Sequence, residues 1–166
     1  MDSDAFKDIV VKHHCQMYRI AYAIIGNESD AEDMVQETVI KMWNRRHLMN
    51  GIENYSSYCS TMVRNQSIDF VRSRQAVSVD IEPETVEIVD NRSADYELNR
   101  QEDLIRIKDM LCDLPENMRR VMQLRVFSDC SMEDISTITG LSNGNIRTLL
   151  SRARKRLKEF FENQNR

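Results

Sequence analysis

Acidic side chains recur at helical spacing in the segment DAEDMVQETVIKMWNRR, residues 30–46. If the segment is a helix, Asp30, Asp33 and Glu37 share one face, because successive side chains are about 100° apart. Grouped carboxylates can bind a metal ion, a cationic partner or only water. A helical carboxylate metal centre needs a Glu-x-x-His motif and acids from facing helices, and the sequence offers neither near this segment. We therefore expect no metal, no cofactor and no catalytic group here.

The opposite face of the same helix is apolar, which predicts that it packs against a core. It comprises Ala31, Met34, Val35, Thr38, Val39, Met42 and Trp43. Ile40, however, falls within the polar face, beside Gln36 and Asn44. An apolar centre inside a polar rim is typical of a protein interface. The alternative is an ordinary solvated surface, which would be the preferred interpretation if this acidic helix were the only motif in the chain.

A second group of side chains suited to binding lies near the C-terminus, where residues 147–158 contain Arg and Lys but no acid. Arg147, Thr148, Ser151 and Arg152 fall on the early outward turns of the predicted helix. Arg can bond guanine through two hydrogen bonds, and Ser or Thr can bond any base edge. Arg154 and Lys155, further along, suit phosphates, and so does Lys158. The pattern indicates DNA binding, with a solvated basic helix as the alternative.

The elements that must position this basic helix form a helix-turn-helix motif. Ser131 and Asp134 fit a capping box that opens a short helix, and Gly140 lies where a tight turn needs a permissive backbone. Ser142 or Asn143 can cap the second helix. The expected inward residues are Ile135, Ile138, Leu141, Ile146, Leu149 or Leu150, Ala153 and Leu157. In this motif the N-terminal residues of the second helix read bases in the major groove.

The rest of the chain predicts an all-α fold. Its 166 residues include only four Gly and two Pro, which favours helices joined by short loops. Helices are expected over residues 4–25, 30–46 and 56–74, with Ser29 or Asp30 capping the second. After Pro115 another helix should turn Val121, Met122, Leu124 and Phe127 inward. We predict two small helical domains, residues 1–74 and 98–166, joined by an acidic linker over 75–97.

Charge and cysteine content limit the possible functions. The net charge of −4 argues against DNA binding, but acids crowd residues 80–103 while the C-terminal helix is basic. The four cysteines are scattered, and only His13, His14 and Cys15 come near a metal-ligand cluster. We expect buried, reduced thiols. The absence of a membrane-length apolar run and of a signal-peptide pattern predicts a cytoplasmic protein.

Four motifs in order carry a resemblance to a known family: DAEDMVQETVIKMW, RNQSIDFVRSR, LPENMRRVMQLR and EDISTITGLSNGNIRTLLSRARKRL. Together they resemble a bacterial RNA polymerase sigma factor of the extracytoplasmic-function type, over residues 5–161. The resemblance implies a protein with no active site of its own. It would bind core RNA polymerase and promoter DNA, direct transcription initiation at −10 and −35 elements, and have an anti-sigma factor as a further partner.

The resemblance also implies roles for particular residues. Asp33, Gln36 and Glu37, around Ile40, match positions that contact the clamp helices of the largest polymerase subunit. The −10 element would be bound by Tyr55, Arg64, Asn65, Arg72 and Arg74, with Tyr58 either a stacking surface or part of the core. The −35 element would be bound by Asn145, Arg147, Thr148, Ser151, Arg152, Arg154 and Lys155.

This chain departs from the family pattern at two places. Asp134-Ile135-Ser136 stands where the family usually has EIA, and Gly144-Asn145-Ile146 where it has GTV. Both departures leave the promoter preference open. The alternative function is a helix-turn-helix regulator that binds operators as a symmetric dimer. That function would explain residues 131–161 but would leave the acidic helix and RNQSIDFVRSR without a role.

Overall fold

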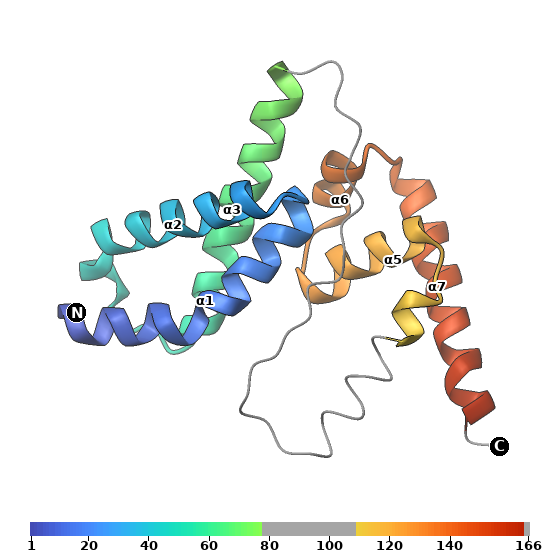
Figure 1. Cartoon of the computed structure of the whole chain (residues 1–166), viewed down its shortest axis with the longest axis horizontal. Coiled ribbons are helices and arrows are strands. Elements are labelled where there is room, and N and C mark those ends of the chain that lie inside the picture. Colours follow the sequence, from blue (N-terminus) through green and yellow to red (C-terminus); the bar gives the residue numbers. More distant parts are fainter. Residues whose placement is uncertain (78–108, 165–166) are drawn as a thin grey trace.

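The structure, a computed structural model, describes residues 1–77 and 109–164, and every regular element in these ranges is helical (Figure 1). The first half contains α1 (Ser3–Ile25), α2 (Glu28–Asn44), the short 3₁₀ helix η1 (Arg46–Met49) and α3 (Tyr55–Val77). The second half contains α5 (Glu116–Met122), the π-helical turn η2 (Gln123–Phe127), α6 (Met132–Thr139) and α7 (Asn143–Gln164). The predicted all-α class is confirmed.

The first half is a three-helix unit in which α1 contacts both α2 and α3. The apolar face expected of α2 is the buried one, with Ala31, Met34, Val35, Thr38 and Met42 inside. Thr38 is tolerated there because its hydroxyl donates to the Met34 carbonyl at 2.7 Å, and a buried hydroxyl with a partner costs little.

The connection between α1 and α2 is tighter than the sequence predicted. Gly26 ends α1 with φ 79°, a left-handed conformation that glycine adopts without steric cost. The next residue, Asn27, caps α2, because its Oδ1 accepts from the amide of Asp30 at 3.0 Å. The expectation that Ser29 or Asp30 would cap this helix was therefore wrong. The helix begins at Glu28, two residues before the expected start at 30, and both residues lie inside it.

The second half is built around the predicted helix-turn-helix. Ser131 and Asp134 form the reciprocal capping box of α6, and Gly140 ends that helix at φ 73°. Ile135, Ile146, Leu150 and Ala153 are buried, while Ile138, Leu141, Leu149 and Leu157 are partly buried against them. Ser142 provides the cap of α7, accepting from the Asn145 amide at 3.2 Å.

Phe127 contradicts the expected packing after Pro115. Val121, Met122 and Leu124 are buried as predicted, but Phe127 is 58% exposed. The chain adopts a π-helical turn over Gln123–Phe127. Such a turn contains more residues than an α-helical one, so it shifts the side chains that follow it off the expected face.

The predicted linker falls mostly outside the described residues. α3 continues through Val77, three residues past its expected end at 74, so the first part of the 75–97 segment is helical. Residues 78–97, and the start of the predicted second domain at 98–108, lie outside the described ranges.

The cysteines follow the prediction only in part. Cys59 and Cys130 are buried, and burial raises the pKa of Cys59 to about 11 and that of Cys130 to about 12. These thiols therefore stay protonated at neutral pH. Cys15 and Cys112 are exposed, because each lies two residues from a buried methionine, Met17 or Met110, and so points to the opposite side of a helix. The expectation that all four thiols are buried was therefore wrong. Among the described residues no helix is long and apolar enough to cross a membrane.

Candidate functional site

The acidic face of α2 is open to solvent. Asp33, Gln36 and Glu37 are exposed, and Ile40 is 59% exposed among them. Asp30 differs from this group, because it is half-buried and its carboxylate pairs with Arg74 of α3. The described residues contain no group of His, Cys, Asp or Glu side chains arranged to hold a metal. What the face offers is a small apolar centre with a polar rim, which suits a protein partner.

Aromatic contacts fix the C-terminal end of α2 and with it the orientation of this face. The Trp43 ring meets Phe6 of α1 edge-on, with ring centroids 5.1 Å apart. Arg46 lies over the same indole at 4.0 Å and donates to the Trp43 carbonyl at 3.0 Å. A cation over an indole face is attracted by the ring quadrupole. The contact therefore holds the turn that leads toward α3.

The N-terminal part of α3 is attached to α1 through Gln16. The Gln16 side chain donates to Ser60 Oγ at 2.8 Å and accepts from Ser56 Oγ at 2.9 Å. The sequence analysis missed this pair of bonds, because the partners are 40 and 44 residues away and no local pattern marks them. These two bonds fix the start of α3 against α1. They therefore also restrict the position of the loop that precedes α3.

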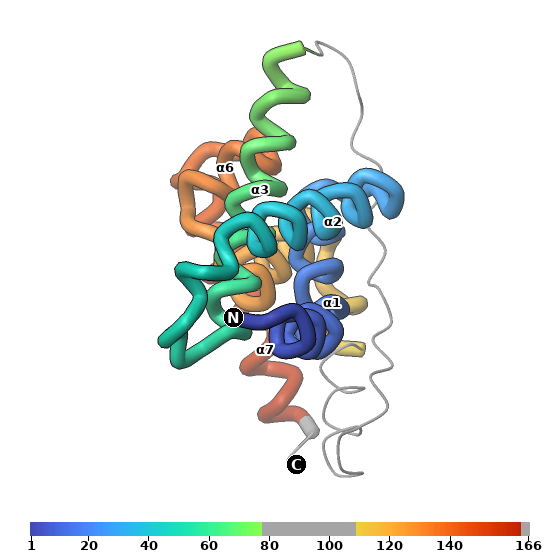
Figure 2. Tube along the Cα trace, turned by 90° about the vertical axis from the view of Figure 1, so that its left-hand side faces the viewer, coloured from blue at the N-terminus to red at the C-terminus, as the bar shows by residue number. Residues whose placement is uncertain are grey.

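The residues predicted to bind the −10 element all lie on α3. Asn65 is exposed, and Tyr55 is half-buried with its hydroxyl donating to the Met49 carbonyl at 3.3 Å. Tyr58 is also half-buried and packs against the core, so it belongs to the core at least in part. The last turns of α3 project beyond the rest of the helices in both views (Figures 1 and 2).

The three arginines of α3 are not free cations. Arg74 pairs with Asp30 and lies over the Phe70 ring at 5.5 Å. Arg72 is 3.8 Å from Asp69 on its own helix and also 3.8 Å from Asp134 of α6. Arg64 is only 15% exposed in its side chain. The sequence could not predict the partners from the second half, Asp129 for Arg64 and Asp134 for Arg72, because they are distant along the chain.

The basic face of α7 lies as the sequence predicted. The outward residues Asn145, Arg147, Thr148, Ser151, Arg152, Arg154 and Lys155 are all exposed. Thr148 donates to the Gly144 carbonyl at 3.0 Å, which leaves its hydroxyl oxygen able to accept. The helix runs for 22 residues from its N-terminus beside the α6–α7 turn, so its first turns are the part that can enter a groove.

Two family models match the chain, sigma-70 region 2 over residues 9–77 and sigma-70 region 4 over residues 104–157. The chain therefore belongs to the sigma-70 family. Its relatives place it among the factors of the extracytoplasmic-function type.

Two curated relatives and one solved structure illustrate the similarity. The RNA polymerase sigma factor SigV of Bacillus subtilis is 28% identical over 90% of this chain and 86% of its own length. The factor SigW of the same organism is 26% identical over 95% of this chain and 89% of its own length. The sigma factor RpoE in complex with the anti-sigma factor NepR, from Bartonella quintana, matches with a TM-score of 0.52 and 25% identity, covering 95% of this chain and 97% of that one.

The function follows from this membership. The protein is a promoter-recognising sigma factor for RNA polymerase, and it is not an enzyme. Its working surfaces are interfaces with the polymerase and with promoter DNA.

Proposed function

We propose that each of the three surfaces has a separate task in initiation. The face of α2 around Ile40 docks on the clamp helices of the largest polymerase subunit. The observation that carries this assignment is the 59% exposure of Ile40 inside a ring of exposed polar residues. Burying an isolated apolar side chain at the centre of a polar rim is favourable on association. Asp33, Gln36 and Glu37 supply hydrogen bonds and charge around it.

We further propose that α3 and the loop before it bind and open the −10 element. Strand opening needs cations for the backbone and a place for an unstacked base. Arg64, Arg72 and Arg74 provide guanidinium groups along α3, and exposed Asn65 can bond a base edge. Tyr55 lies at the start of the helix, where its ring can border a base pocket.

For the −35 element we propose readout by the first turns of α7. Arg147 and Arg152 reach base edges, with Asn145, Thr148 and Ser151 beside them, because all five are exposed on the early part of the helix. Arg154 and Lys155 follow on the exposed surface of the same helix and contact phosphates, which position the helix without specifying sequence.

An anti-sigma factor completes the proposed set of partners. The solved relative from Bartonella quintana was crystallised with one, and we extend that partnership to this chain. Because the polymerase and the chromosome are its working partners, we also propose that the protein acts in the cytoplasm.

The assignment is tested by run-off transcription with bacterial core polymerase on a pool of templates whose upstream DNA is randomised, with each upstream sequence identified by a barcode in the transcribed region. With the protein present, sequencing of the transcripts should reveal two enriched blocks more than one helical turn apart. Without it, no block should be enriched. A single palindromic block, or enrichment that does not need the protein, would contradict the proposal and favour a plain DNA-binding regulator.

Replacing Asn65 by Ala should reduce initiation on duplex templates more than on templates whose −10 region is already a bubble. The physical reason is that extruding a base costs a few kcal/mol, and the bubble removes that cost. The measurement is the ratio of wild-type to variant run-off product on each template. Thr61→Ala, at an exposed position one helical turn earlier, serves as the control. Equal defects of Asn65→Ala on both templates would show that the residue does not limit opening.

A further inference from the structure

The loop before α3 is held between two fixed points. At one end Met49 is fully buried, and the Ile52 amide bonds back to its carbonyl at 3.3 Å across a turn in which Gly51 has φ 91°. At the other end the Tyr55 hydroxyl donates to the same Met49 carbonyl at 3.3 Å. Only residues 50–54 lie between these points, so the shape of the loop depends on where the first turn of α3 lies.

The buried face of α3 fixes that position only loosely. Four of its five buried residues have small side chains, namely Cys59, Ser60, Val63 and Ser67. Apolar attraction is non-directional, and small side chains form shallow ridges that interlock weakly with a neighbouring helix. The buried Ser67 hydroxyl has no hydrogen-bond partner in the described part of the chain, so it adds no directional contact. Something else must hold α3 against rotation and sliding.

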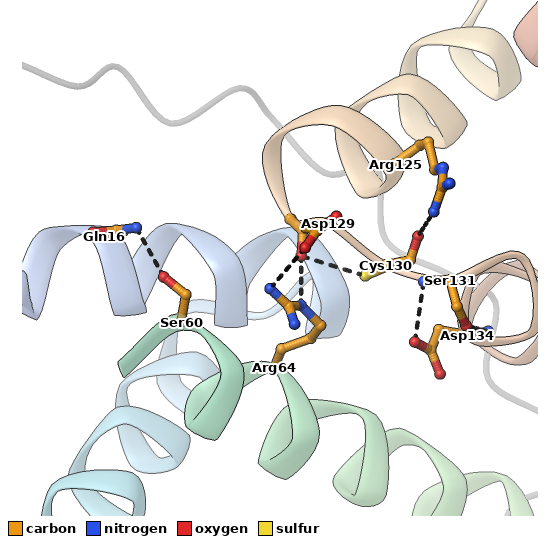
Figure 3. A network of polar contacts seen from close by, with 9 residues as sticks. Gln16, Ser60, Arg64, Arg125, Asp129, Cys130, Ser131 and Asp134 are labelled. Atoms are coloured by element: carbon orange, nitrogen blue, oxygen red, sulfur yellow. Dashed lines mark hydrogen bonds and ion pairs between the residues drawn. The ribbon is translucent and has the colours of Figure 1, made fainter. Parts of the chain in front are cut away.

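Gln16 of α1 supplies the directional contact. Its side-chain amide donates to Ser60 Oγ at 2.8 Å (Figure 3), and its side-chain carbonyl accepts from Ser56 Oγ at 2.9 Å. Ser56 and Ser60 are neighbours on one face of α3, one turn apart, so a single side chain holds the helix at two points. Because hydrogen bonds weaken when they are bent or stretched, the pair resists both rotation of α3 about its axis and movement along it.

The proposed base contact on α3 is sensitive to such a rotation. Asn65 is exposed and lies five positions beyond Ser60, which places it about 140° further round the helix. A binding group works only when it is held within roughly 10–20° of its productive direction. A small rotation of α3 would therefore turn Asn65 away from the strand and would also change the path of the loop over residues 50–54.

We propose that Gln16 is a positioning residue for −10 recognition. Through Ser56 and Ser60 it sets the direction of Asn65 and the shape of the loop before α3, without contacting DNA itself. The inference rests on the proposed function of α3. The two bonds of Gln16 go to α3, so base preference at the −10 element should depend on Gln16. Polymerase binding by α2 and base preference at the −35 element should not.

Gln16→Met tests the proposal, because it keeps the length of the side chain and removes both hydrogen bonds. The full-length variant is assayed with core polymerase on the randomised template pool, where the wild-type protein should enrich an upstream and a downstream block. The measurement is the ratio of the most to the least favoured base at each position. We expect this ratio to fall roughly fivefold or more at the most selective position of the downstream block, while the upstream block stays as it is.

Ile20→Val is the control for a general loss of stability. Ile20 is buried on α1 one turn after Gln16, and removing one methylene there loosens the same helices without touching a hydrogen bond. The thermal midpoints of the two variants are recorded so that their losses of stability can be compared. Ile20→Val should lower transcription from all templates evenly and keep both blocks as sharp as in the wild type.

Gln16→Glu is the conservative variant that should restore recognition. A carboxylate can accept from both serine hydroxyls, so the downstream block should stay close to the wild-type one. If Gln16→Met does not fold, Ser56→Ala combined with Ser60→Ala removes the same two bonds from the other side and should flatten the same block. Alanine keeps α3 helical.

A downstream block as sharp in folded Gln16→Met as in the wild type would overturn the proposal. Equal flattening of both blocks, the same profile in Ile20→Val, or equal flattening in Gln16→Glu would also overturn it, because the effect would then not come from the two bonds. The wild-type sample separates this failure from failure of the function proposed for α3. Without a downstream block in the wild type, that function itself is wrong.

Discussion

Replacing Asp33, Gln36 and Glu37 together by Ala should weaken binding of core polymerase by roughly 10- to 100-fold, a loss of about 1.4 to 3 kcal/mol. All three side chains are exposed on α2, opposite its buried face. Because Ala is the best helix former, the helix itself should not weaken. The measurement is the dissociation constant for labelled core polymerase, with the thermal midpoint and far-ultraviolet circular dichroism recorded beside it.

A charge-matched control is available in the same half of the chain. The triple change removes two negative charges, and so does the pair Asp8→Ala and Glu53→Ala at exposed positions away from the face. If only net charge matters, both variants should lose affinity equally. Ile40→Ser tests the apolar centre alone and should weaken binding without any change of charge. Wild-type affinity in a folded triple variant would contradict the docking surface.

The two faces of α2 show which structural features could be predicted from the sequence. Periodicity predicted which side is buried, because an amphipathic helix removes its apolar residues from water only by packing that face against a core. The types and spacing of residues correctly placed the capping box at Ser131 and Asp134, and periodicity correctly placed the basic residues of α7 on its exposed face. These features depend on residues within a few positions of each other, so a single segment contains the information.

The features that the sequence did not predict depend on distant partners or on small changes of backbone. Phe127 turned outward because one π-helical turn changed the register. Asn27 rather than Ser29 capped α2, since both residue types favour such a position and local preference cannot choose between them. The burial of Arg64 came from the Ser128–Asp129 segment, 64 residues further along. The arginines of α3 suited DNA by type, but no pattern showed that the same chain already binds them.

Arg147→Ala and Arg152→Ala should each cost roughly 1–3 kcal/mol at one position of the −35 element, which is about 5- to 150-fold in promoter use. Both guanidiniums lie on the exposed early turns of α7, where a bidentate contact to guanine distinguishes it from other bases. Transcripts from the randomised template pool should then show relaxed preference at a single position for each variant, and the other positions should stay as they are.

Lys158→Ala is the matched control on the same helix, with an equal loss of charge. Lys158 lies later on α7 and pairs with Glu162 at 3.8 Å, so it is too far along to read bases. Its loss should lower transcription from all templates by a similar, small factor, because phosphate contacts position the helix without specifying sequence. If Arg147→Ala and Arg152→Ala also act uniformly, the two arginines are phosphate contacts. Base readout would then fall to Asn145, Thr148 and Ser151, whose shorter side chains require the helix to lie deeper in the groove.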